Sequence, residues 1–179
     1  MSRVTALLLS LIVFQSPRTA TAQDPRLAAR LDSLTRAQVE AAVASARGEG
    51  LPTEPLVQKA LEGASKGAPG PRIVAAVEST FADLRRARTA LGERAKPDEI
   101  VAAAAALRAG ASPAMVSEME KVGPHGGVAV PLAVFTDLVA GGMTVDAAWR
   151  SVAELAERGG DDQAFLDLRD RLRPPVSPP

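Results

Sequence analysis

A glycine followed two residues later by a helix-capping residue recurs along this chain and limits what it can fold into. The pattern is carried by Gly110 with Ser112, Gly142 with Thr144, and Gly159 with Asp161. Glycine just after a helix readily adopts the left-handed conformation that closes the last turn, and a Ser, Thr or Asp side chain caps the next helix. Each occurrence therefore predicts that one helix ends and another begins at once.

The spacing of the glycines predicts how these helices are arranged. Three pairs are each 17 residues apart: Gly50 and Gly67, Gly110 and Gly127, and Gly142 and Gly159. This step leaves room for a helix of about 18 Å and a short connection, which makes neighbouring helices antiparallel. At Gly50 the expected cap lies one residue further on, at Thr53. We expect antiparallel helical hairpins stacked as a bundle or as a short solenoid-like array.

Apolar residues recur at helical spacing through most of the chain, and no segment alternates convincingly as a strand. The helical stripes are Leu56, Val57, Ala60 and Leu61; Ile73, Val77, Phe81, Leu84 and Leu91; Ile100, Val101, Ala104 and Leu107; Met115, Val116, Met119 and Val122; Val134, Phe135, Leu138 and Val139; Trp149, Val152 and Ala156; and Phe165, Leu168 and Leu172. The pattern predicts an all-α protein of seven or eight helices, with these stripes in the core.

The two ends of the chain differ from the rest. Residues 1–22 hold one early arginine, an eleven-residue apolar run and the sequence Ala20-Thr21-Ala22, the order typical of a cleaved secretory signal peptide. The run is too short to cross a bilayer. We therefore expect export to the periplasm or the medium without stable membrane insertion, one helical domain over residues 23–173, and a disordered proline-rich tail over 174–179.

Composition excludes several functional classes. The expected mature chain has 19 basic and 21 acidic residues, a formal charge of −2, which does not favour binding to nucleic acid or anionic membranes. Arginine outnumbers lysine 17 to 4, and we attribute this to a GC-rich bacterial genome because the arginines are spread along the chain. The chain has no cysteine, so packing alone must stabilise the exported domain.

Reactive side chains are scarce. The sequence lacks Cys, Tyr and Asn, and its single histidine, His125, lies in the loop "VGPHGG". A catalytic zinc site normally takes three protein ligands, and no second His or Cys is present to join His125. The sequence therefore predicts no catalytic residue, no metal site and no cofactor. A hydrolase that uses His125 is the third of three hypotheses.

The stretch "LTRAQ", from Leu34 to Gln38, resembles the Leu-Thr-x-x-Gln signature of small periplasmic all-helical chaperones of the Spy type. The resemblance implies a protein that cradles unfolded clients. The same residues also fit a capping box, in which the Thr35 and Gln38 side chains each satisfy the backbone donor of the other. We take the capping box as the main interpretation and the chaperone as the second functional hypothesis. The leading hypothesis is an exported, non-enzymatic helical-repeat protein that binds a protein or peptide partner.

Overall fold

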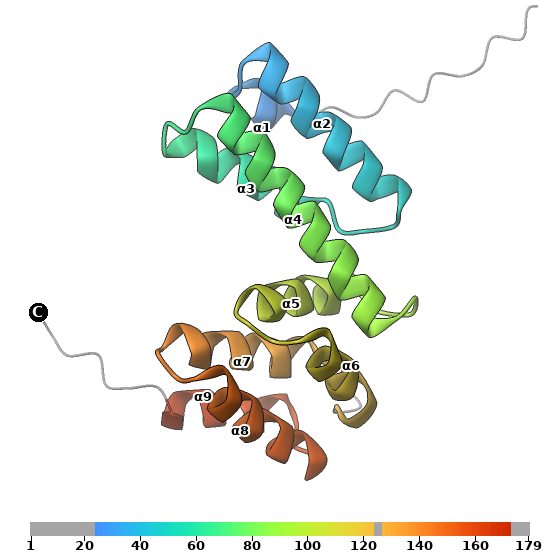
Figure 1. The fold of residues 1–179 in the computed structure, drawn as a ribbon, viewed down its shortest axis with the longest axis vertical. Coiled ribbons are helices and arrows are strands. Elements are labelled where there is room, and N and C mark those ends of the chain that lie inside the picture. The colour runs from blue at the N-terminus through green and yellow to red at the C-terminus, as the bar shows by residue number, and fades with distance from the viewer. Residues whose placement is uncertain (1–23, 124–126, 173–179) are drawn as a thin grey trace, which may run out of the picture.

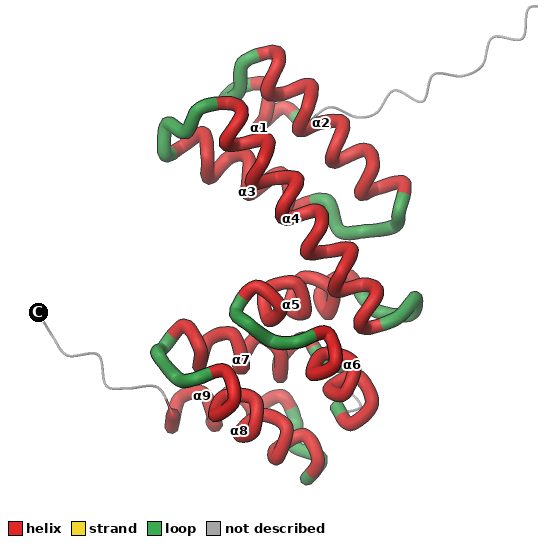
Figure 2. Tube along the Cα trace, viewed as in Figure 1, coloured by secondary structure: helices red, strands yellow, loops and turns green. Residues whose placement is uncertain are grey.

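The computed structural model describes residues 24–123 and 127–172, and every regular element in those ranges is a helix (Figure 2). The all-helical prediction is confirmed. The helices of the described residues are α1 (Pro25–Ala28), α2 (Ser33–Gly48), α3 (Glu54–Ser65), α4 (Gly70–Leu91), α5 (Pro97–Arg108), α6 (Pro113–Val122), α7 (Ala129–Ala140), α8 (Val145–Glu157) and α9 (Asp162–Leu172). The sequence missed α1, because a helix of four residues is too short to show periodicity. The expected signal peptide (1–22) and tail (174–179) lie outside the described residues.

The helices form two rows (Figure 1). In one row α2 packs against α4, α4 against α6, and α6 against α8. In the other, α1 packs against α3, α5 against α7, and α7 against α9. Helices α3 and α5, both fully described, do not pack against each other to any comparable extent, although each packs against α4. The second row is therefore interrupted between α3 and α5.

Helix α4 runs through the centre of the molecule and explains the interruption. Its 22 residues span about 33 Å, whereas the 12 residues of α3 span about 18 Å. Gly63 of α3 lies against Ile73 near the start of α4, while Asp83 in the second half of α4 pairs with Arg108 of α5. Because α3 and α5 pack against different parts of one long helix, they are kept apart.

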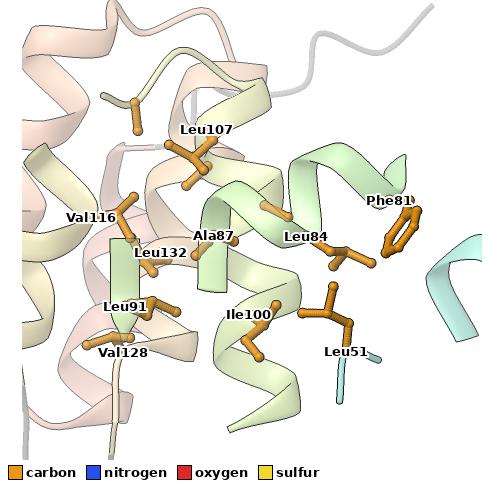
Figure 3. Packing of buried hydrophobic residues seen from close by; sticks show 14 of the residues in the cluster. Leu51, Phe81, Leu84, Ala87, Leu91, Ile100, Leu107, Val116, Val128 and Leu132 are labelled. Carbon is orange, nitrogen blue, oxygen red and sulfur yellow. The ribbon is translucent and has the colours of Figure 1, made fainter. Parts of the chain in front are cut away.

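A continuous apolar core joins these helices. Figure 3 shows buried side chains of α4, α5, α6 and α7 gathered together, among them Leu84, Ile100, Val116 and Leu132. Most of the predicted stripes are buried as expected. Three of their members, Val101, Val122 and Leu172, are instead exposed, and their placement in the core was wrong. Adjacent helical residues point about 100° apart, so that where Ile100 faces the core, Val101 turns outward.

No helix within the described ranges is both long and apolar enough to span a bilayer.

Candidate functional site

Five of the predicted turn glycines close helices in the same way. Gly50, Gly67, Gly110, Gly142 and Gly159 have φ values of +67°, +66°, +111°, +96° and +73°. In each turn the glycine N–H donates to the carbonyl three residues back, and the next residue donates to the carbonyl five residues behind it. This double hydrogen bond is the Schellman motif, which needs a residue at positive φ and so favours glycine.

The predicted caps follow three of these turns. The Ser112 hydroxyl accepts from the N–H of Met115 at 3.2 Å, and the Thr144 hydroxyl from that of Ala147 at 3.3 Å. A carboxylate oxygen of Asp161 accepts from the N–H of Ala164 at 2.9 Å. Thr53 occupies the N-cap position of α3, but its side chain makes no capping hydrogen bond.

Gly127 has a different role from the one that its spacing predicts. It has a φ of +116° but follows no helix, because α6 already ends at Val122, beside an extended Gly123. A Cβ on Gly127 would overlap the Glu99 carboxylate, which accepts from the N–H of Lys96 at 2.8 Å and from that of Val128 at 3.4 Å. Because Gly127 has no side chain, the Glu99 carboxylate can accept hydrogen bonds from the backbone at the starts of both α5 and α7. Reading it as a helix-ending glycine was wrong.

The capping-box interpretation of "LTRAQ" is also wrong. The cap of α2 is Asp32, whose carboxylate accepts from the N–H groups of Leu34 and Thr35, each at 3.0 Å. Thr35 lies inside the helix, and its hydroxyl donates to Asp32 at 2.6 Å, the main reason that the pKa of Asp32 is lowered. Thr35 is buried beneath Gly70 of α4, where a Cβ would overlap its hydroxyl. The threonine therefore serves helix packing, while Gln38 is exposed.

His125 lies outside the described residues, and the hydrolase that uses it stays a prediction. Within the described ranges, no group of three or more His, Asp and Glu residues converges as metal ligands.

An open groove of about 850 Å³ lies at the interruption between α3 and α5. Its lining residues come from the start of α3, from α5 and from α7: Pro52, Glu54, Pro55, Gln58, Pro97, Asp98, Val101, Ala102, Ala105, Ala129, Val130, Ala133, Thr136 and Asp137. Nine of these fourteen side chains are apolar, and four of the nine are alanines.

The apolar surface of the groove follows from the composition of two helices. From Ile100 to Leu107 every residue of α5 is apolar, and α7 holds a single charged residue, Asp137. A helix that is apolar on all sides is normally covered on all sides. Here Ile100 and Leu107 face the core, while the outer face of α5, including the exposed Val101, remains uncovered. The groove is the place where the uncovered faces of α5 and α7 meet.

The charges that line the groove are carboxylates, and no Lys or Arg is among the lining residues. Glu54 is held by two hydrogen bonds of 2.9 Å from Arg26, which are the main cause of its lowered pKa. Asp137 lies 3.7 Å from Arg169. Asp98, in the first turn of α5, has no ion-pair or hydrogen-bond partner in the described part of the chain. The charged side chains of the groove lining are therefore all acidic, and Asp98 is the one among them that is unpaired within the described residues.

Sequence reasoning missed every residue of this groove. The available signal was the width of the apolar arc in "IVAAAAAL", which exceeds the single stripe that a surface helix needs. Close packing between helices accounts for the small side chains of the buried Ala103, Ala104 and Ala106. It leaves Ala102 and Ala105, which line the groove, unexplained.

Comparison of the chain with protein-family models, with curated proteins and with solved structures gives no match. Function is therefore inferred from the groove.

Proposed function

We propose that this chain is an exported, non-enzymatic helical protein that binds a protein or peptide partner in the groove between α3, α5 and α7. The observation that carries the proposal is the uncovered apolar face shared by α5 and α7. Concave surfaces lined mainly by apolar side chains with a few polar groups are where proteins commonly bind ligands and partners. Export follows from the signal-peptide pattern of residues 1–22, and the binding domain comprises residues 23–173.

The proposed architecture is a solenoid-like stack of antiparallel hairpins with one break. It is supported by the two rows of helices and by the five identical turns. Solenoids commonly bind partners along an extended surface formed by one row of helices. In this chain the break in the row supplies that surface.

The free energy of association limits what kind of partner can bind in the groove. Each large apolar side chain that a partner buries contributes about 1.5–3 kcal/mol. Association itself costs about 4–15 kcal/mol, and a micromolar complex needs a net gain of about 8 kcal/mol. A partner must therefore place several anchors in the groove, which favours a folded segment or a long peptide over a small molecule.

The test places a photo-crosslinking amino acid at Val101, inside the groove, and at Ala82, an exposed position on α4, as the matched control. Each variant is expressed with its leader in the native host and irradiated. A discrete crosslinked partner from Val101 but not from Ala82 is expected, and Ala105→Trp, which fills the groove, should remove it. The same crosslinks from both positions would contradict groove binding.

The same preparation separates the other hypotheses. Intact mass should show a product that begins at Gln23, and a mass that includes residues 1–22 would contradict export by signal cleavage. Many unrelated unfolded proteins crosslinked to Val101 would favour the chaperone. A hydrolase activity that is lost in His125→Ala would contradict the non-enzymatic proposal.

A further inference from the structure

We propose that the partner segment is a cationic amphipathic helix, with large apolar side chains on one face and Lys or Arg on either side of them. This inference rests on the proposed function and specifies the chemistry of the partner. It is argued from the shape of the groove and from the signs of the charges around it.

The shape fits a helix. The groove is lined by α5 and α7, which pack against each other, and by the start of α3, so a helix bound in it would contact all three. The lining residues run from Pro97 to Ala105 on α5 and from Ala129 to Asp137 on α7. At 3.6 residues per turn, this is a length of about two turns of a helix.

The small side chains of the floor define the complementary face. Ala102 and Ala105 lie three residues apart on α5, and Ala129 and Ala133 lie four apart on α7, so each pair shares one face of its helix. Close packing sets large residues against small ones. A partner helix with Leu, Met or Phe at positions i, i+3 or i+4, and i+7 meets this requirement.

The charges select the sign of the partner. Asp98 lies in the first turn of α5 and Asp137 in the last turn of α7, so the two carboxylates flank the apolar floor at different positions. Arg26 forms an ion pair with Glu54 and neutralises its charge, and Arg169 does so in part for Asp137. Asp98 has no such partner in the described residues. A Lys or Arg near Asp98 gains attraction, whereas a Glu there meets a like charge without compensation.

The experiment uses three fluorescent 14-residue helical peptides with the same leucine stripe and with Lys, Gln or Glu at all flanking positions. Binding to the purified protein is measured by fluorescence anisotropy at low and high salt. We expect the Lys peptide to bind at least tenfold more tightly than the Glu peptide. The difference should shrink several-fold in 0.5 M NaCl, because salt screens exposed charges.

Substituting the groove carboxylates tests whether they cause the preference for the Lys peptide. Asp98→Asn combined with Asp137→Asn should weaken binding of the Lys peptide several-fold and leave binding of the Gln peptide unchanged. Asp146→Asn is the matched control, because Asp146 is an exposed carboxylate in the first turn of α8 and lies outside the groove. An equal effect of the control would overturn the inference.

The outcomes separate this inference from the proposed function. If the Lys and Glu peptides bind alike and Ala105→Trp abolishes both, the groove binds helices but the charge argument is overturned. If every peptide binds the unmodified protein and Ala105→Trp with the same affinity, while the Val101 crosslinker still captures a discrete partner, the partner is not an amphipathic helix. Groove binding then stands. Binding that requires removal of residues 174–179, or that competes with self-association, would identify the chain itself as the occupant and overturn the cationic partner.

Discussion

Replacing Gly110 by alanine tests whether the helix-ending glycines also serve packing between helices. Gly110 has a φ of +111°, and a Cβ built there would lie 2.9 Å from Cγ2 of Val145, the first residue of α8. Gly142 closes α7 with a φ of +96°, but a Cβ at that position meets nothing within 4 Å. Gly142→Ala therefore measures the conformational cost alone, and Gly110→Ala adds a steric clash.

The expected magnitudes follow from these two terms. A non-glycine residue at an unfavourable positive φ costs about 1–3 kcal/mol, which is the expected loss in Gly142→Ala. Forcing an extra methyl group into a packed site typically costs a further 1–3 kcal/mol. We expect Gly110→Ala to lose about 1–2 kcal/mol more than Gly142→Ala, because the methyl groups of Val145 can move somewhat.

The assay is urea unfolding, followed by circular dichroism and by the fluorescence of Trp149, the single tryptophan of the chain. A double-mutant cycle of Gly110→Ala with Val145→Ala isolates the clash, since removing Cγ2 relieves the contact but leaves the backbone strain. We expect a coupling energy of about 1 kcal/mol. Equal losses in Gly110→Ala and Gly142→Ala, or a coupling energy of zero, would refute the packing argument.

Three further predictions concern charge and surface. The pKa of Glu49 is held below its usual 4.5 by Arg85, so its contribution to stability is present above that pH and lost as the pH falls. Glu49→Gln should therefore flatten the decline of the melting temperature as the pH falls below 4.5, and an unchanged slope contradicts the assignment. Arg88 donates a hydrogen bond to the Gly50 carbonyl at 2.9 Å. Arg88→Met should therefore lower the free energy of unfolding, measured in urea, by about 1–3 kcal/mol. The same substitution at the more exposed Arg86 should lower it by under about 1 kcal/mol. The described residues expose only four large hydrophobic side chains, so weak or no suppression of aggregation is expected at equimolar client; strong suppression would favour the chaperone.

The sequence predicts well those features that depend only on neighbouring residues. A Schellman turn is closed by hydrogen bonds within six residues, and a capping side chain reaches only three residues ahead, so Gly110 with Ser112 can be read directly from the letters. The stripe from Ile73 to Leu91 follows from helical geometry in the same way. These local rules are sufficient to predict an all-helical fold and most of its turns.

Predictions failed where residues distant in the sequence decide the outcome. Gly127 follows the 17-residue spacing, yet its conformation serves Glu99, 28 positions earlier in the chain. Thr35 resembles an N-cap, but its burial depends on Gly70 of another helix. Val101 has the hydropathy of a core residue and lines the groove instead. No periodicity within one helix contains this information, because it lies in the contacts between helices.

The groove arises from the same kind of non-local cause, and the sequence marks its position indirectly. The regular glycine spacing fails between Gly67 and Gly110, where the 22-residue α4 takes the place of a three-turn helix. A helix of ordinary length would bring its two neighbours together and cover the outer face of α5. Because α4 is longer, α3 and α5 pack against different parts of it and do not cover one another. The two most apolar helices of the described chain, α5 and α7, are consequently left uncovered beside the stretch where the glycine spacing is interrupted.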